Sequence, residues 1–378
     1  MNLQKVIIAP DSFKGTISAS QTTDIIAHEV LAVFPGCTVV KMPIADGGEG
    51  SMETIIGVLG GEIYETLVRA PDDRQIPAYF GVAADGTGII EMAQSCGLTK
   101  QSGLHPMTSS TYGFGQQLTA ALDLGVQRFM LCIGGSATTD AGCGMAAALG
   151  VLFLDKRGNS FIPCGETLKD IAHIDTSDLD VRIHGCSFTV MCDVDNPLFG
   201  SNGAAYIYAP QKGASSQQVV ILDDGLRHLG NAFPEVFRRD RTTTPGAGAA
   251  GGLGAGCMVF LSARLMRGSE AILRLSGFRE HLVNADLIIT GEGQLDEQSF
   301  HGKVLSGILR DAGSIPVLSI CGVCRCSTDI LAKHNLTVFE TSDGITAEES
   351  MADPARYIKA AAKKAMERYL HNQPREKR

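Results

Sequence analysis

The chain has 378 residues, of which 44% are apolar and 19% are charged, and its formal net charge is −9 at pH 7. A chain of this length predicts two or three domains, and its acidic balance gives no basic face of the kind that nucleic-acid binding requires. The apolar runs are too short to span a bilayer, and the N-terminus enters a strand without a secretory signal. We therefore expect a cytoplasmic protein with reduced cysteines and no membrane partner.

Both ends of the chain predict alternating strands and helices. Near the N-terminus we expect strands at 3–9 and 37–43, a helix that begins at a capping box of Ser18 and Gln21, and a helix at 50–59. Near the C-terminus we expect strands at 285–290, 316–320 and 337–340, with helices at 303–312, 328–334 and 354–370. Such alternation is typical of a parallel sheet.

The middle of the chain has a different pattern. Apolar segments at 78–83 and 87–92 flank Asp85-Gly86, which predicts a β-hairpin. Further helices are expected near 114–124, 141–150, 217–232 and 250–265, and strands near 128–133 and 187–192. The predicted fold is α/β: residues 1–66 and 284–378 form a discontinuous Rossmann- or flavodoxin-like parallel-sheet domain, residues 67–283 form an inserted α+β domain, and the active site is expected in a cleft between them.

Glycine accounts for 44 residues, and many of them cluster in four loops that also carry acidic or hydroxyl side chains. The loops span 46–50, 134–140, 245–252 and 290–296. Glycine lets backbone N–H groups approach a ligand closely, and acids among the glycines indicate a metal ion or a proton to be moved. The pattern is typical of an enzyme that handles a nucleotide triphosphate.

Acidic residues follow three of the predicted strands. Asp11 and Lys14 come after the first strand, Asp46 and Glu49 after the second, and Glu292 after the strand at 285–290. Ligands bind beyond the carboxyl ends of the strands in an open parallel sheet, and Mg²⁺ prefers oxygen ligands, so these side chains predict a magnesium site. The alternative is that Asp11 and Asp46 only cap the helices that follow them.

The loop from Gly134 to Gly144 follows one predicted strand and opens a predicted helix. A helix N-terminus is a ready anion site, and Ser136, Thr138 and Thr139 add hydroxyl groups, so we expect phosphate to bind here. A tight packing turn would also need the glycines, although it would not need the hydroxyls.

Asp193 leaves a predicted strand, where a carboxylate is well placed to act as a general base toward a substrate hydroxyl. Lys212 adds a cation nearby in sequence, although a surface lysine is usually only solvated. The sequence contains no Walker-type loop, dinucleotide fingerprint, serine-hydrolase elbow or histidine metal spacing. The thiols of Cys321, Cys324 and Cys326 are expected in a strand-end turn rather than in a metal or redox cluster.

Taken in order, seven motifs resemble those of the type 1 bacterial glycerate kinases, and they cover essentially the whole chain. The motifs are Ile8-Ala-Pro-Asp-Ser-Phe-Lys-Gly15, Ala45-Asp-Gly-Gly-Glu-Gly50, Gly134-Gly-Ser-Ala-Thr138, Cys192-Asp-Val-Asp-Asn-Pro-Leu198, Pro210-Gln-Lys-Gly-Ala214, Pro245-Gly-Ala-Gly-Ala-Ala-Gly-Gly252, and the segment from Thr290-Gly-Glu-Gly293 through Gly302-Lys303. The resemblance implies a two-domain fold with a discontinuous Rossmann-like domain. It also implies ATP-dependent phosphorylation of D-glycerate to 2-phosphoglycerate with Mg²⁺.

From the residues and the resemblance together, our hypothesis is that Asp193 accepts the proton of the glycerate 2-hydroxyl during in-line attack on the γ-phosphoryl group. Lys14 is the second candidate catalytic residue. Candidate metal ligands are Asp46, Glu49 and Glu292, and Asp11 also belongs to this acidic set. Candidates for binding phosphate or substrate are Asp11, Ser12, Gly47, Gly48, Gly134, Gly135, Ser136, Thr138, Lys212, Gly246, Gly248, Gly291 and Gly293.

Two alternatives stay open at this point. A kinase of the same fold would give 3-phosphoglycerate or act on another small hydroxy acid, because the pocket and not the motifs selects the acceptor. The chain could instead be a nucleotide-binding regulator that has lost catalysis. The expected partners are glycerate and ATP, with no nucleic acid, and a homodimer is left open.

Overall fold

The computed structural model describes residues 3–13, 16–44, 47–237, 241–300 and 304–372. Backbone contacts divide the chain into two compact units, one of Met1–Asp46 with Arg267–Arg378 and the other of Gly47–Met266. Within the described ranges, no helix is long and apolar enough to cross a membrane. Each unit has its own sheet and its own hydrophobic core.

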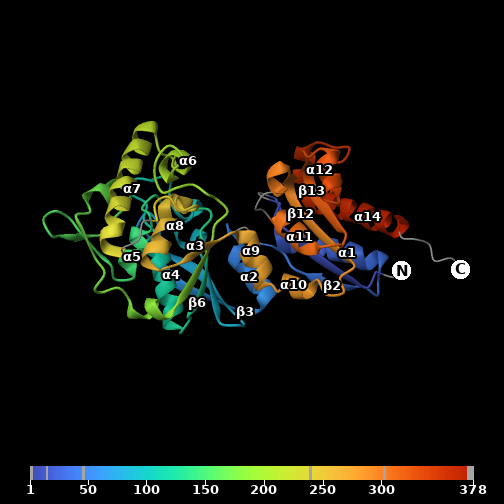
Figure 1. Ribbon diagram of the computed structural model, residues 1–378, viewed down its shortest axis with the longest axis horizontal. Helices are drawn as coiled ribbons and strands as arrows, with labels where there is room; N and C mark the ends of the chain where they lie inside the picture. Colours follow the sequence, from blue (N-terminus) through green and yellow to red (C-terminus); the bar gives the residue numbers. More distant parts are fainter. Residues whose placement is uncertain (1–2, 14–15, 45–46, 238–240, 301–303, 373–378) are drawn as a thin grey trace. The chain divides into compact units, whose positions relative to one another are not determined.

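The first unit is built on a parallel sheet that joins the two ends of the chain. Its described strands are β1 (Lys5–Pro10), β2 (Thr38–Lys41), β12 (Leu287–Leu295), β13 (Val317–Cys324) and β14 (Leu336–Glu340). They lie in the order β14-β13-β12-β1-β2, and adjacent strands are parallel. Figure 1 shows the blue N-terminal segments beside the orange and red C-terminal ones. The predicted parallel sheet made from both chain ends is confirmed.

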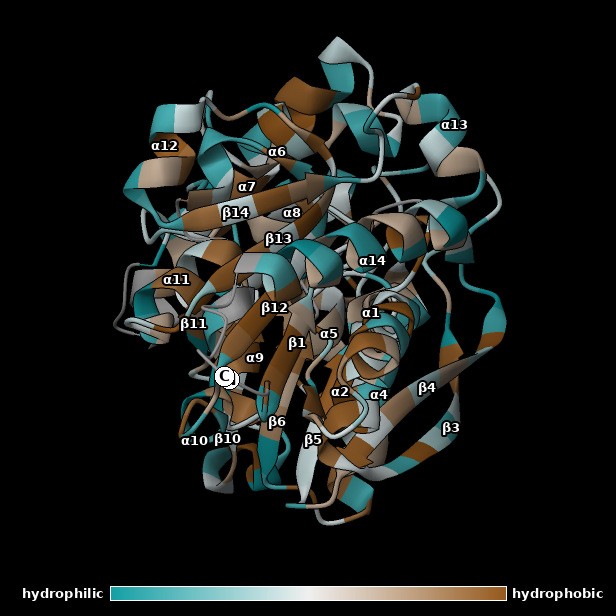
Figure 2. Ribbon diagram, turned by 90° about the vertical axis from the view of Figure 1, so that its right-hand side faces the viewer, coloured by the Kyte–Doolittle hydropathy of each residue, from teal (hydrophilic) through white to brown (hydrophobic). Residues whose placement is uncertain are grey.

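Both faces of this sheet are buried, because successive side chains of a strand point to opposite faces. Val6 and Ile8 of β1 pack with Ile26 of α1 (Ala19–Val33) and Ile358 of α14 (Pro354–Asn372). Ile7, which lies between them, is fully buried on the other face. Figure 2 shows the brown strands of this sheet behind helices α1 and α14.

The order of the strands reverses its direction between β1 and β12. From β1 the chain moves outward to β2, whereas from β12 it moves the other way to β13 and β14. Because crossovers between parallel strands are right-handed, the connecting helices α1 and α11 (Val304–Ala312) belong to opposite faces. Such a switch point opens a crevice at the carboxyl ends of the two central strands.

The described part of the first unit contains further helices, most of them short. They are α9 (Gly268–Leu275), α10 (Phe278–His281), α12 (Thr328–Lys333) and α13 (Ala347–Ala352), with a 3₁₀ turn at Glu297–Phe300. Helix α1 begins at the predicted capping box, in which the Ser18 hydroxyl accepts a hydrogen bond from the Gln21 N–H (3.2 Å).

The second unit is built on a mixed sheet whose described strands lie in the order β11-β10-β6-β5-β4-β3. The strands are β3 (Gly61–Arg69), β4 (Gln75–Ala83), β5 (Thr87–Glu91), β6 (Arg128–Cys132), β10 (Ser187–Met191) and β11 (Arg264–Met266). The hairpin predicted at Asp85-Gly86 is confirmed between β4 and β5. Beyond it, β5, β6, β10 and β11 are parallel. This parallel part was not expected, because long irregular connections hide the βα alternation.

Helices and a small sheet surround the mixed sheet. The helices are α2 (Ser51–Leu59), α3 (Met92–Cys96), α4 (Tyr112–Asp123), α5 (Cys143–Ala148), α6 (Ala204–Tyr208), α7 (Ser216–Phe237) and α8 (Ala249–Phe260), with 3₁₀ turns at Leu98–Lys100, Gly165–Asp170, Val181–Gly185 and Pro210–Lys212. The small sheet contains β7 (Leu152–Leu154), β8 (Ser160–Phe161) and β9 (His173–Asp175). One core joins Ile90, Leu131 and Val190 of the large sheet to Phe114 of α4 and Phe260 of α8.

The chain passes from one unit to the other after Asp46 and again after Met266. The sequence predicts these boundaries after residues 66 and 283. Strand β3 pairs with β4 over its full nine residues, from Gly61 to Arg69, and therefore belongs to the second unit. Helix α9 packs against α11 in the first unit. Neither contact follows from the local sequence pattern. Strands β3 and β4 pair across a turn, and α9 and α11 are distant in the sequence.

Candidate active site

The carboxyl end of β1 and the adjacent part of β12 bring together several residues that the sequence singled out. The Asp11 N–H donates a hydrogen bond to the Gly291 carbonyl (2.8 Å), and the Asp11 carboxylate accepts one from the Ser12 N–H (2.6 Å). Glu292 follows Gly291 on β12, and its carboxylate accepts a hydrogen bond from the Ser299 hydroxyl (3.0 Å). The predicted grouping of Asp11 with Glu292 at one sheet edge is therefore seen in the structure.

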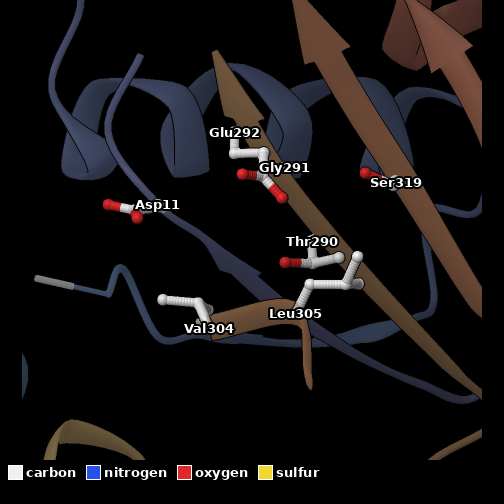
Figure 3. A pocket seen from close by; sticks show the side chains of 7 residues that line it. All are labelled: Asp11, Thr290, Gly291, Glu292, Val304, Leu305 and Ser319. Carbon is white, nitrogen blue, oxygen red and sulfur yellow. The ribbon is translucent and has the colours of Figure 1, made fainter. Parts of the chain in front are cut away.

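A small pocket lies at this edge, with a cavity volume of about 10 Å³, roughly the space of one water molecule. Its lining consists of Asp11, Thr290, Gly291, Glu292, Val304, Leu305 and Ser319. Figure 3 shows the oxygens of Asp11, Glu292 and Thr290 near one another, Ser319 on the neighbouring strand, and the apolar side chains of Val304 and Leu305 below. The Thr290 hydroxyl donates to the Ala9 carbonyl (2.9 Å).

Glycines 291 and 322 have a packing role at this edge. A side chain at Gly291 would overlap the carbonyl of Ile320 on β13, and a side chain at Gly322 would overlap the carbonyl of Gly293. Close approach of β12 and β13 therefore accounts for Gly291 and Gly322, and the predicted contact of Gly291 and Gly293 with phosphate stays a prediction.

A second sheet edge carries the candidate base. Glu91, Cys132 and Met191 pair in register at the carboxyl ends of β5, β6 and β10. The segments that follow β6 and β10 therefore leave the sheet side by side, one at Gly134 and the other at Asp193. Asp193 is exposed.

The loop after β6 is held by hydrogen bonds inside the protein. The Gly134 N–H donates to the Gly47 carbonyl (2.9 Å), and the Ala137 N–H donates to the Cys96 carbonyl (2.9 Å). A side chain at Gly134 would lie 2.8 Å from the Cα of Gly48, and Gly135 has a left-handed backbone with φ of 76°. Close packing thus explains Gly134, and the turn explains Gly135.

The buried side chain of Lys212 supports this loop from the interior of the protein. Its Nζ donates to the Ser136 hydroxyl (2.8 Å) and to the Thr138 carbonyl (2.6 Å), and its side chain is 1% exposed. Burial lowers the pKa of Lys212 to about 7, although the nearby Asp140 carboxylate favours the charged form. Lys212 was expected to touch the substrate or phosphate directly. Its burial makes it a support of the loop instead.

The helix N-terminus after this loop already holds an anion, which is the carboxylate of Asp140. Asp140 accepts hydrogen bonds from the N–H groups of Gly142 and Gly144 (both 3.2 Å) and from the N–H and hydroxyl of Thr111 (both 2.8 Å). Burial raises the pKa of Asp140, and these donors act against that rise. Asp140 therefore already accepts hydrogen bonds from two N–H groups at this helix N-terminus, and phosphate binding by the loop stays a prediction.

Glu91 supports the glycine loop before α2. Its carboxylate accepts hydrogen bonds from the N–H groups of Gly50 (3.1 Å) and Met52 (3.0 Å). Glu91 thus caps the start of α2, where the N-cap residue Gly50 has no side chain to accept a hydrogen bond. Burial raises the pKa of Glu91 to about 7. Gly47 is buried, Gly48 is half-buried and Glu49 is exposed.

The loop at 245–252 packs against the loop that follows β6 and the loop that follows β10. The Gly248 N–H donates to the Asn196 carbonyl (2.9 Å). Side chains at Gly246 and Gly248 would overlap Cys192 and the Pro197 carbonyl, respectively. These contacts explain Gly246 and Gly248 by packing, and phosphate binding by either stays a prediction.

Two candidate residues, Lys14 and Asp46, lie outside the described residues. Among those that are described, no group of three or more histidine, cysteine, aspartate or glutamate side chains is arranged to hold a metal ion. A metal site in the described part would therefore rely on one or two carboxylates with hydroxyl or water oxygens, which is a usual arrangement for Mg²⁺.

Sequence reasoning missed three residues of these edges: Glu91, Asp140 and Ser319. Glu91 ends an apolar strand, Asp140 ends a glycine- and hydroxyl-rich loop, and Ser319 interrupts the apolar strand Val317–Cys324. A polar side chain at such a position is a usable signal, because it must find a partner when the strand is buried.

A family model described as the glycerate kinase family matches residues 6–370. The chain belongs to the glycerate kinase family. It is 38% identical over 366 residues to a glycerate kinase of Bacillus subtilis, covering 95% of this chain and 96% of the relative. It is 39% identical over 337 residues to a glycerate 2-kinase of Escherichia coli, covering 88% of each.

A crystal structure described as glycerate kinase 2 from Salmonella typhimurium LT2 resembles the whole chain. The TM-score is 0.88 at 34% identity, and the match covers 98% of this chain and 100% of the other. The resemblance to glycerate kinases and the predicted fold class are confirmed by these matches.

Proposed function

We propose that the chain transfers the γ-phosphoryl group of ATP to the 2-hydroxyl of D-glycerate, which gives 2-phosphoglycerate and ADP. The observation that carries the catalytic assignment is the exposed Asp193 at the carboxyl end of β10, beside the loop that Lys212 supports. Membership in the glycerate kinase family and the identity to the Escherichia coli glycerate 2-kinase support the choice of substrate and of the 2-position.

In the proposed reaction, the 2-hydroxyl oxygen forms a bond to the γ-phosphorus while the bond to the β–γ bridging oxygen breaks and ADP leaves. The carboxylate of Asp193 accepts the hydroxyl proton. Phosphoryl transfer needs mainly positioning and neutralisation of charge, so the surrounding residues act by holding groups in place.

Lys212 contributes by positioning. Its ammonium group fixes the side chain of Ser136 and the backbone at Thr138. This contact holds the loop at Gly134 in one conformation next to Asp193, with Ser136 and Gly135 as the candidate contacts to phosphate. Lys14 is the proposed cation that meets the substrate directly.

Asp11 and Glu292 are the described residues whose surroundings fit Mg²⁺. Their pocket offers oxygen donors and contains a buried serine hydroxyl without a partner in the described structure. When bound, the ion would offset the negative charge of the transferred phosphoryl group. Glu49, which is exposed, and Asp46 are the other proposed ligands.

A coupled assay for ADP release, run with and without D-glycerate, tests the proposal. Glycerate-dependent ADP is the expected result. ATP binding without turnover would instead identify a regulator that has lost catalysis, and turnover only with another hydroxy acid would identify a different acceptor. A phosphorus NMR spectrum of the product then distinguishes the 2-phosphate, which we expect, from the 3-phosphate.

A further inference from the structure

Ser319 presents an unusual hydroxyl group at the pocket between β1, β12 and β13. Its side chain is 1% exposed, and its Oγ has no hydrogen-bond partner in the described structure. A buried hydroxyl without a partner is destabilising, because it loses its hydrogen bonds to water on folding and forms none within the protein. Ser319 lines the pocket, so an occupant of the pocket would satisfy it.

The position of Ser319 places it on the same face as two other oxygen donors. Ser319 pairs in register with Thr290 across β13 and β12. Glu292 follows two residues later on β12 and therefore points to the same face of the sheet. All three residues line the pocket, together with Asp11.

The chemistry of these donors selects the kind of occupant. Two carboxylates at one small opening repel an anion and favour a cation. The donors contain oxygen only, which suits a hard divalent ion. The cavity volume of about 10 Å³ has room for roughly one water-sized body, which excludes a nucleotide or an organic cation from the pocket itself.

We propose that Ser319 belongs to the divalent-cation site at Asp11 and Glu292, through a hydrogen bond with a water molecule of the ion, an inference that rests on the metal site proposed above. Asp11 and Glu292 supply the charged oxygens. Mg²⁺ keeps several of its waters in protein sites, so a hydroxyl that meets one of them orients the ion without replacing a carboxylate. The role assigned to Ser319 does not depend on the identity of the phosphoryl acceptor.

The test measures Mn²⁺ binding to the full chain by electron paramagnetic resonance, with no nucleotide and no glycerate present. We expect one Mn²⁺ per chain, displaced by Mg²⁺. Ser319→Ala should weaken Mn²⁺ binding by about tenfold or more, as the loss of an outer partner does in other metal sites. Glu292→Gln should reduce binding at least as strongly.

Thr22→Val is the matched control. Thr22 lies on α1 in the same unit, and its hydroxyl is also buried without a partner in the described residues, but it does not line the pocket. This variant should bind Mn²⁺ like the wild type. Without metal, the melting temperatures of Ser319→Ala and Thr22→Val should match or exceed that of the wild type, because each change removes an unsatisfied buried group.

Three outcomes would overturn the inference: no Mn²⁺ binding by the wild type, wild-type affinity in Ser319→Ala or Glu292→Gln, or equal weakening by Thr22→Val. Because the assay contains neither substrate, each of these results leaves the proposed phosphorylation of glycerate standing. Conversely, if the wild type released no ADP in response to glycerate, the inference about the metal site would not be contradicted.

Discussion

Lys212 places an ammonium group where water does not reach, in contact with the loop beside the candidate base. A buried lysine is costly in its charged form, and the hydrogen bonds to Ser136 and Thr138 offset part of that cost. The residue is thus better suited to hold the loop than to capture a substrate from solution.

The lowered pKa of Lys212 predicts a pH dependence of stability. The pKa falls from 10.5 to about 7 on folding, so below pH 7 the buried charge destabilises the fold fully. As the pH rises from 7 toward 10.5, the folded protein loses the proton first and this penalty is relieved. Relative to Lys212→Met, the free energy of unfolding of the wild type should therefore rise by up to about 1.4 kcal/mol per pH unit in this window.

Urea unfolding of both proteins at pH 7 and pH 9 measures this effect. Lys169→Met, at an exposed lysine of the same unit, is the control and should differ from the wild type by the same amount at both values. A constant difference between the wild type and Lys212→Met would contradict the buried charge.

Asp193 gives the residue-scale prediction for catalysis. Asp193→Asn keeps the shape of the side chain but removes the base, so kcat should fall by about 10²–10⁴-fold, while ATP binding changes little. Asp195→Asn, two residues away and also exposed, is the matched control and should retain kcat. Wild-type kcat in Asp193→Asn, measured by ADP release, would refute the assignment.

At the scale of elements, the glycine-rich loops act first as packing devices. Helix α8 begins with left-handed backbone at Ala250, Gly251 and Gly252, and the Ala141 N–H donates to the Gly251 carbonyl (3.1 Å). The loop after β6 and the start of α8 approach too closely for side chains between them. Clustered glycines in this chain therefore mark loops pressed together around the site as much as contacts with a ligand.

Gly251→Ala tests this close approach. A side chain there would overlap the Thr138 carbonyl, in addition to the strain of φ +69°. Gly158 shares a left-handed backbone with φ +82° but has no atom within 4 Å of an added side chain, so Gly158→Ala isolates the strain, about 1–2 kcal/mol. Gly251→Ala should lose roughly 1–3 kcal/mol more through overpacking.

Thermal unfolding of the two variants gives the comparison. A melting temperature of Gly251→Ala equal to that of Gly158→Ala would show that the loops can separate without cost. Glycerate-dependent ADP release by Gly251→Ala should also fall, because Thr138 lies on the loop that Lys212 supports.

At the scale of the molecule, each unit has a separate core. One cluster runs from Phe80 to Ala263, and the other joins Leu3 near the N-terminus to Met366 near the C-terminus. The second unit is one continuous segment of chain, so it contains its whole sheet without any strand from the other unit.

A fragment of residues 47–266 should therefore unfold cooperatively by circular dichroism and lack glycerate-dependent ADP release. A fragment of residues 67–283, which has the boundaries expected from the sequence, loses α2 and most of β3. It should unfold without cooperativity, because Met52 and Ile56 of α2 are buried. Equal cooperativity in both fragments would favour the boundaries expected from the sequence.

Features that depend on neighbouring residues were predictable from the sequence. The capping box at Ser18, the hairpin at Asp85-Gly86 and the strands of the first unit need only local periodicity and turn chemistry, and they lie where they were expected. The ordered motifs also identified the family, and Asp11 and Asp193 follow strands as expected. Glu292 instead lies within β12, which continues to Leu295, because β12 and β13 stay paired beyond residue 290. The boundaries of the units were not predictable, since β3 joins its sheet by pairing rather than by pattern.

The sequence alone thus determined the family, the parallel sheet formed by both chain ends and the residues that leave its strands. Only the tertiary structure decided which groups are already satisfied: Asp140 fills the helix N-terminus that was expected to hold phosphate, Lys212 is buried under a loop, and Ser319 is left without a partner. The physical reason is that hydrogen bonding and desolvation depend on segments distant in the chain, such as Thr111 with Asp140 and Lys212 with Ser136.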